Sequence, residues 1–282
     1  MSIGLFTAFL FATSILAGLL GSLTGLGGGV VIVPALALLF HVDIRYAIGA
    51  SLVSVIATSS GAAVAYIREG LSNIRIGMFL EVATTLGALL GAYLTAEVSS
   101  HSIAIVFGTA LLYSAYASFR TSHNSSSGAA ISAESNLLAA RLHMNGSYPG
   151  PAGEEHYSAQ RIPLGFGIMF GAGTLSGLLG IGSGAVKVLA MDQAMKLPFK
   201  VSTTTSNFMI GVTAAASAGV YLSHGYIEPG IAMPVMLGVL GGSFIGTRIL
   251  VKVRAGALKL LFGLVIVLLG FEMIFSGWTG RI

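Results

Sequence analysis

Charged residues are scarce in this chain of 282 residues: they make up 9% of it, whereas hydrophobic residues make up 55%. Soluble domains carry roughly 25% charged residues, so a solvated surface cannot be built from this composition. The mean hydropathy is +0.89, and apolar runs of about 20 residues lack strand-like alternation, which favours spanning helices over a barrel. The composition therefore predicts an all-α polytopic membrane protein embedded in a lipid bilayer.

Cysteine is absent, which excludes disulfides and thiolate metal sites. The apolar runs contain no Ser–His–Asp arrangement, no paired carboxylates and no metal-ligand spacing, and all six histidines fall in predicted loops. We therefore expect no enzymatic chemistry, no metal and no cofactor. The net charge of +4 is spread over loops and gives no reason to expect a nucleic-acid partner.

Glycine, by contrast, is abundant at 39 residues, and it is concentrated in two breaks within apolar sequence, at 18–30 and 177–187. An offset of 155 relates the two halves from residue 27 to residue 108. It carries the glycines at 27, 29, 70, 87, 91 and 108 to glycines at 182, 184, 225, 242, 246 and 263. The chain is an internal duplication. We divide it into a first transmembrane repeat (1–120), a polar linker (121–161) and a second transmembrane repeat (162–282).

Basic loop residues predict how the repeats are oriented, because cytoplasmic loops concentrate Lys and Arg. If each broken segment crosses the membrane once, the thirteen basic residues other than Lys187 divide six against seven between the two faces. If each broken segment enters and returns on the same side, eleven lie on one face, and only Arg45 and Arg281 lie opposite. A re-entrant hairpin, or a full crossing with a short return helix, gives these loop sides.

The basic-residue distribution therefore predicts two inverted-topology repeats, each with a glycine-broken helix plus three transmembrane helices. In the cytoplasmic membrane, the linker 121–161 would lie inside and both termini outside. Inverted repeats with broken helices are the architecture of secondary transporters.

Each glycine break predicts an anion site. A helix that begins inside the membrane exposes backbone N–H groups and the positive end of its dipole, and glycine lets a ligand approach this backbone closely. The alternative is that the glycines only permit close helix packing, which is our interpretation of Gly87 with Gly91 and of Gly242 with Gly246. The candidate binding residues in the breaks are Gly27, Gly28, Gly29, Gly182, Ser183 and Gly184.

Lys187 lies about one turn after Gly184 in an apolar segment, where a charge is costly. Its counterpart by the offset is Ile32, so the duplication does not require it. We interpret Lys187 as the countercharge for a bound anion. The alternative is a snorkelling or structurally paired lysine, with Asp192 or Gln193 as partner.

Uncharged polar groups near the start of the following helices complete the candidate site. These are Ser51 in the first half and Thr205, Ser206 and Asn207 in the second. They donate hydrogen bonds without adding charge, which suits an oxyanion that must be released again. The alternative is that the hydroxyls bond carbonyls of their own helices. We expect Glu81 to be an interfacial carboxylate, with a proton relay as the alternative.

At these residues the sequence resembles the sulfite exporter TauE/SafE family of anion permeases. The stretch from Gly21 to Pro34 looks like the first motif of that family, and Ala47 to Leu52 looks like the A-x-x-[TA]-S-L that follows it. Gly177 to Gly184 and Ser202 to Asn207 look like the repeated pair.

The second half departs from this pattern at two positions. Ser183 replaces the central glycine, and Leu189 stands where the offset from Pro34 would place a proline. The resemblance covers the chain apart from the linker, and it implies transport of sulfur-containing anions such as sulfite or organosulfonates.

The sequence thus predicts a secondary transporter or exporter of a small anion, with a sulfur oxyanion or organosulfonate as substrate and H+ as the candidate coupling ion. The anion would bind between the two glycine breaks and cross by alternating access. One alternative is a passive anion channel with the same site, and another is a transporter of a non-sulfur organic anion. A further alternative is a membrane-embedded interaction partner that docks through residues 121–161.

Overall fold

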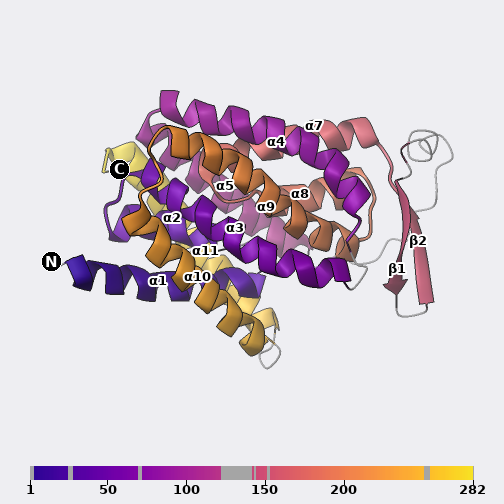
Figure 1. Cartoon of the computed structure of the whole chain (residues 1–282), viewed down its shortest axis with the longest axis horizontal. Coiled ribbons are helices and arrows are strands. Elements are labelled where there is room, and N and C mark those ends of the chain that lie inside the picture. The colour runs from indigo at the N-terminus through magenta and orange to yellow at the C-terminus, as the bar shows by residue number, and fades with distance from the viewer. Residues whose placement is uncertain are drawn as a thin grey trace.

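A computed structural model describes residues 3–24, 28–68, 72–121, 142, 144–150, 153–250 and 255–281. Gly27 and residues 122–141 of the linker lie outside the described residues. Nearly all of the described chain is helical, as the composition predicts (Figure 1).

The two halves contain the same order of helices. The first half comprises α1 (Ile3–Thr24), α2 (Gly29–Pro34), the π-helical turn η1 (Ala35–Leu39), α3 (Ile44–Arg68), α4 (Ile74–Glu97) and α5 (Ser100–Thr121). The second half comprises α7 (Ile162–Leu179), α8 (Gly184–Leu189), η3 (Ala190–Ala194), α9 (Phe199–Ser223), α10 (Pro229–Leu250) and α11 (Ala255–Thr279). This repetition is what an internal duplication requires.

Among the described residues, three helices are long and apolar enough to cross a membrane by length and composition: α4, α7 and residues 229–246 of α10. Two of these helices begin at residues that favour a helix start. Asn73 caps α4, because its side-chain oxygen accepts a hydrogen bond from the backbone N–H of Ile76 at 3.0 Å. A proline at the second position of its sequence starts α7.

Each short broken segment runs back beside the long helix that precedes it. The ring of Phe40, just after η1, lies 5.6 Å from the ring of Phe6 near the start of α1. In the second half, the N–H of Gln160 donates to the carbonyl of Met195 at 2.9 Å, which brings the end of η3 to the start of α7. Each break is therefore the tip of a helical hairpin.

Glycines allow the closest helix pairs to form between the two halves. A methyl group at Gly87 or Gly91 of α4 would collide with carbonyls of α7, and one at Gly242 of α10 would collide with the Ile15 carbonyl of α1. The packing interpretation of these three glycines is confirmed. Consequently α1 packs against α10 and α4 packs against α7.

The helix pairs differ in direction. Along α4 and α7 the contacts advance together, from Gly87 beside Phe170 to Gly91 beside Thr174, so these helices are parallel. The same is true of α1 and α10. In contrast α5 and α11, which correspond by the offset, run in opposite directions, because Gly277 lies beside His101 whereas Gly270 lies beside Gly108.

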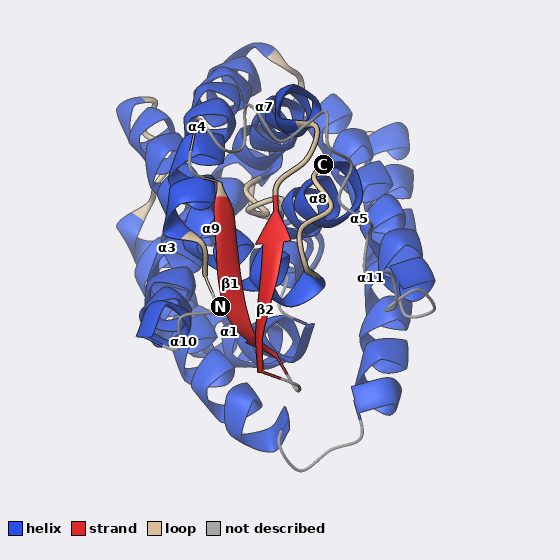
Figure 2. Cartoon of the chain, turned by 90° about the vertical axis from the view of Figure 1, so that its right-hand side faces the viewer, coloured by secondary structure: helices blue, strands red, loops and turns tan. Residues whose placement is uncertain are grey.

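A β-hairpin lies at one end of the helical body, at the right in Figure 1 and facing the viewer in Figure 2. Its antiparallel strands are β1 (Asn145–Gly150) and β2 (Gly153–Ser158). The Nδ2 of Asn73 donates to the Tyr157 hydroxyl at 2.8 Å and ties the hairpin to the start of α4, while burial raises the pKa of that hydroxyl. The sequence analysis predicted only a polar linker here, because residues 153–158 show no alternation of apolar and polar side chains.

Candidate functional site

The two glycine breaks meet in the interior of the protein. The Ser51 hydroxyl of α3 donates to the carbonyl of Gly180, at the tip of the second hairpin, over 2.8 Å. A Cβ at Gly29, which opens α2, would lie 2.6 Å from the Ser51 Oγ and 3.0 Å from the Gly180 oxygen. Only a glycine at position 29 therefore lets the first hairpin approach the second this closely.

The second break owes its shape to left-handed backbone conformations. Gly180 ends α7 with a φ of +65°, Gly182 has a φ of +71°, and Ser183 follows with a φ of +46°. The first two are glycines, for which this region carries no steric cost. Ser183 does pay that cost, roughly 1–2 kcal/mol for a residue with a Cβ. The departure from the family pattern at position 183 thus coincides with local backbone strain.

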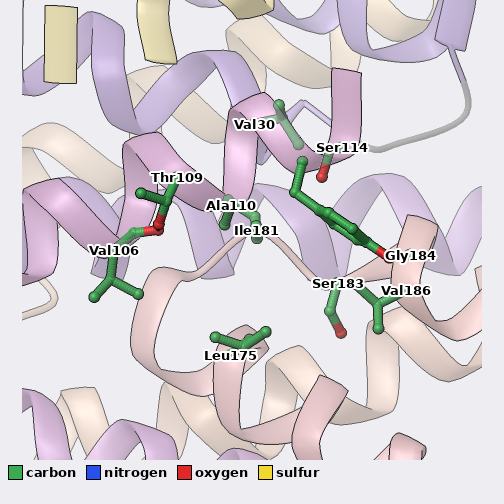
Figure 3. A pocket seen from close by; sticks show the side chains of 11 residues that line it. Val30, Val106, Thr109, Ala110, Ser114, Leu175, Ile181, Ser183, Gly184 and Val186 are labelled. Carbon is green, nitrogen blue, oxygen red and sulfur yellow. The ribbon is translucent and has the colours of Figure 1, made fainter. Parts of the chain in front are cut away.

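Ser183 is also unusual in its surroundings. Its side chain is only 4% exposed, and its hydroxyl has no hydrogen-bond partner among the described residues. It lines a cavity of about 370 Å³ between α5, α7 and α8, shown in Figure 3. The cavity is mostly apolar, with hydroxyl groups from Thr109, Tyr113 and Ser114 of α5 around it. An unsatisfied buried hydroxyl is costly.

Lys187 lies one turn after Ser183, and its backbone N–H bonds the Ser183 carbonyl at 3.1 Å. Its side chain is fully buried and does not line the cavity. The ammonium donates to the Thr213 hydroxyl of α9 at 2.6 Å, and that hydroxyl lies 2.6 Å from the Glu81 carboxylate of α4. Lys187 is thus structurally paired, as the alternative predicted, but its partner is Thr213 and neither Asp192 nor Gln193.

Glu81 is 4% exposed. The prediction of an interfacial carboxylate is therefore wrong, because α7 and α9 pack against α4 and cover this side chain. Nothing in the sequence singles out Thr213. Its hydroxyl is one among many in α9, and no local pattern distinguishes the one that faces a charge on another helix.

The remaining candidate residues separate into two groups. The Ser206 hydroxyl donates to the Gly184 carbonyl at 3.3 Å and so lies at the second break with Gly182 and Ser183. Other candidates lie elsewhere: a methyl at Gly28 would meet Val239 of α10, and Thr205 accepts a hydrogen bond from the Asn73 N–H at 3.0 Å. Asn207 is half-buried, and Gly27 lies outside the described residues.

Leu189 adopts the backbone conformation of the proline that it replaces. Both residues have a φ of −61° and a ψ of −39°, and each precedes a π-helical turn. The π turn is therefore a property of the hairpin's packing in both halves, and it does not require proline. This second departure from the family pattern leaves the backbone unchanged.

A model of one protein family matches nearly the whole chain. It is described as Sulfite exporter TauE/SafE, and it covers residues 10–273. The chain belongs to this family. As a TauE/SafE protein it is a membrane transporter.

Curated relatives carry names of the same kind. The chain is 28% identical over 282 residues to the probable membrane transporter protein YunE of Bacillus subtilis, covering 95% of this chain and 97% of the relative. It is 25% identical to the probable membrane transporter protein YdhB of the same organism, over 83% and 86%. A probable membrane transporter protein of Xylella fastidiosa is 24% identical over 94% and 95%. No solved structure matches the chain.

Proposed function

We propose that this TauE/SafE protein is a secondary transporter of a small anion, a sulfur oxyanion or organosulfonate, which binds where the two glycine breaks meet. The observation that carries the proposal is the Ser183 hydroxyl, buried without a partner beside a cavity of about 370 Å³. Gly180, Gly182 and Ser183 adopt left-handed conformations. The Gly180 N–H still bonds the Ser176 carbonyl at 2.8 Å, but the N–H groups of Gly182 and Ser183 precede α8 and lie outside its helical bonding. Such groups, with a hydroxyl, bind oxyanions without adding charge.

The candidate residues take different roles in this proposal. Ser183 and the backbone of Gly182 and Gly184 contact the anion. Ser51 and Ser206 keep the second break in shape, because their hydroxyls already donate to its carbonyls. Lys187 compensates the charge of the anion from one turn behind, where the low dielectric constant of the interior strengthens its field. Ligand contacts by Gly27, Gly28, Gly29, Thr205 and Asn207 stay predictions.

The helix directions support inverted repeats and alternating access. Helices α5 and α11 correspond by the offset and pack in opposite directions, which is how equivalent helices meet across a two-fold axis in the membrane plane. Contacts between loops are consistent with the two faces that the basic-residue count predicts. Arg45 donates to the carbonyls of Thr95 and Val98 on one side, whereas Asn73 meets Tyr157 on the other. We place the second side in the cytoplasm and the termini outside the cytoplasmic membrane.

The experiment is anion uptake by proteoliposomes with labelled sulfite, methanesulfonate and acetate. We expect the sulfur anions to be taken up in preference to acetate, and Ser183→Ala to weaken apparent affinity roughly 10-fold or more, since a hydrogen bond to a charged group contributes about 1.5–3 kcal/mol. The control is Ser223→Ala, an exposed serine of α9. Lack of uptake of all three anions, or unchanged affinity in Ser183→Ala, would overturn the proposal.

The alternatives give different results in the same vesicles. A transporter that alternates access accelerates uptake of labelled anion when unlabelled anion is preloaded, because the loaded site returns faster. A passive channel lets the label equilibrate with the electrochemical potential and shows no such acceleration. A preference for acetate would favour the non-sulfur organic anion.

A further inference from the structure

A buried chain of three side chains connects α8, α9 and α4 beside the second glycine break. Lys187 donates to Thr213, whose oxygen lies within hydrogen-bonding distance of both the Lys187 ammonium and the Glu81 carboxylate. We infer that Glu81 binds the proton that accompanies each anion, so that the protein is a proton–anion symporter. This inference rests on the proposed anion site and adds to it the coupling ion and the residue that carries it.

The two oxygens of Glu81 are in different environments. Oε1 accepts from the hydroxyls of Thr213 at 2.6 Å and Thr85 at 3.2 Å. Oε2 is buried and has no hydrogen-bond partner among the described residues. A buried carboxylate oxygen without a hydrogen-bond partner is energetically costly, and a proton bound to it removes the negative charge of the carboxylate. Oε2 is therefore the atom at which we place the proton.

The Thr213 hydroxyl forms hydrogen bonds with both charged groups, Lys187 and Glu81. Its hydroxyl has a single hydrogen, and it can donate that hydrogen either to Glu81 or to the Met209 carbonyl at 2.9 Å. The Lys187 ammonium supplies the bond that the hydroxyl oxygen accepts. When Glu81 becomes protonated, Thr213 can turn its hydrogen to Met209. The lysine then keeps its bond while the carboxyl group loses its negative charge.

Lys187 and Glu81 balance each other electrically. Ionisable groups from the surrounding helices lie away from the network: α7 contains none, and α9 contributes Lys200 and Tyr221 near its two ends, 13 and 8 residues from Thr213. The other ionisable groups on α4 and η3 are Arg75, Tyr93, Glu97 and Asp192. A buried uncompensated charge costs several kcal/mol. Without a ligand, the positive lysine and the negative glutamate therefore form a neutral site.

A bound anion disturbs this balance, and a proton restores it. A monovalent anion one turn from Lys187 brings the net charge of the site to minus one. Formation of an O–H bond between a proton from water and Oε2 of Glu81 returns it to zero, and the lysine keeps its own proton. On the opposite side the anion and the proton leave together. Both the empty site and the loaded site are neutral, so either can reorient across the membrane without carrying charge through the low-dielectric interior.

Proton uptake on binding tests this directly. Methanesulfonate is a suitable probe because it stays ionised throughout the pH range in which proteins fold, so any proton that is taken up binds the protein. In weakly buffered detergent solution with a pH indicator, we expect the wild-type protein to take up one proton for each methanesulfonate bound. Glu81→Gln should bind the anion and take up none. Glu97→Gln, which changes the exposed carboxylate at the end of the same helix, should behave like the wild type.

Vesicle transport gives a second readout. A pH gradient, acid on the side of the anion, should drive accumulation of methanesulfonate by the wild type, and a membrane potential alone should not. Glu81→Gln should lose this accumulation and retain exchange of labelled for unlabelled anion. Anion binding by the wild type without proton uptake, or pH-driven accumulation by Glu81→Gln, would overturn the inference alone. Failure of the wild type to bind either methanesulfonate or sulfite would overturn the proposed function and the inference together.

Discussion

Ser183 combines a strained backbone with an unsatisfied hydroxyl, and the two properties can be separated by substitution. Ser183→Gly removes the steric cost of the left-handed conformation as well as the hydroxyl. We expect it to stabilise the protein by about 1 kcal/mol and to weaken anion affinity as much as Ser183→Ala does. Thermal unfolding in detergent and anion binding measure the two effects. A glycine variant that is stabilised and binds the anion normally would show that the hydroxyl has no role in the site.

Gly29 is the point where the first hairpin touches the second. In Gly29→Ala the new methyl would crowd the Ser51 hydroxyl and the Gly180 carbonyl, so the tips must separate. We expect a destabilisation of about 1–3 kcal/mol, as is typical of overpacking, together with loss of transport. The control is Gly219→Ala in α9, where a methyl would meet nothing within 4 Å. Equal melting temperatures for the two variants would contradict this contact.

For single residues, the sequence predicts which positions lie at the site better than it predicts which residues they contact. Gly29, Ser51 and Ser206 could be identified because repetition at a fixed offset singles them out. The burial of Glu81 could not, since its charge partner lies 106 residues away in the sequence and a single acidic residue near a helix start looks the same whether it faces water or a lysine.

The crossing of α4 and α7 depends on backbone contact at glycines from both helices. A methyl at Gly177 would collide with the Ala88 carbonyl, whereas one at Gly171 of the same helix would meet nothing within 4 Å. We expect Gly177→Ala to lower the melting temperature in detergent clearly, by an overpacking cost of about 1–3 kcal/mol, and Gly171→Ala to leave it nearly unchanged. Equal effects would show that the two helices can move apart at little cost.

Tyr221 links α9 by a hydrogen bond to the end of α7, just before the second break. Its hydroxyl lies 2.9 Å from the Thr95 hydroxyl and donates to the Gly177 carbonyl at 3.0 Å. Tyr221→Phe keeps the ring and removes these bonds, so we expect a loss of about 1–3 kcal/mol in thermal stability because a buried carbonyl is left unpaired. Tyr113→Phe, which changes an exposed tyrosine of α5, is the control. Equal thermal stability of the two variants would show that the Tyr221 hydroxyl does not hold α9 against α7.

At the scale of elements, long apolar runs predict the helices well because the bilayer demands a minimum length. The β-hairpin could not be predicted, since its strands lack an apolar face and depend on the contact of Tyr157 with Asn73. The π-helical turns were equally unforeseen. Of the two in the described part of the chain, one follows a proline and the other a leucine, so no residue type marks them.

The arrangement of loops predicts which parts of the molecule a reagent outside the cell can reach. The chain has no cysteine, so each introduced cysteine is the only thiol. Ser99→Cys, between α4 and α5, should react with a membrane-impermeant maleimide in intact cells. Ser147→Cys in β1 should react only after permeabilisation. Labelling of both positions in intact cells would contradict the proposed orientation.

For the molecule as a whole, the offset and the basic residues predict the repeated order of helices and their opposed directions. They do not reveal which helices pack together. Helix α1 contacts α10 and α4 contacts α7, so each tight pair joins one helix from each half. This choice depends on glycines on faces that match in shape, and a single sequence does not show which faces match.

The pairing of α1 with α10 and of α4 with α7 has a consequence for how the gene arose. A chain of half this length would leave the glycine faces of its first and third long helices uncovered, because each finds its partner in the other half. With the inverted repeats that we propose, a single-repeat protein would need a second copy in the opposite orientation to cover these faces. Fusion of two such copies through a polar linker would fix one orientation for each copy and free the two halves to diverge. The buried Lys187 has Ile32 as its counterpart by the offset, so it belongs to one half alone.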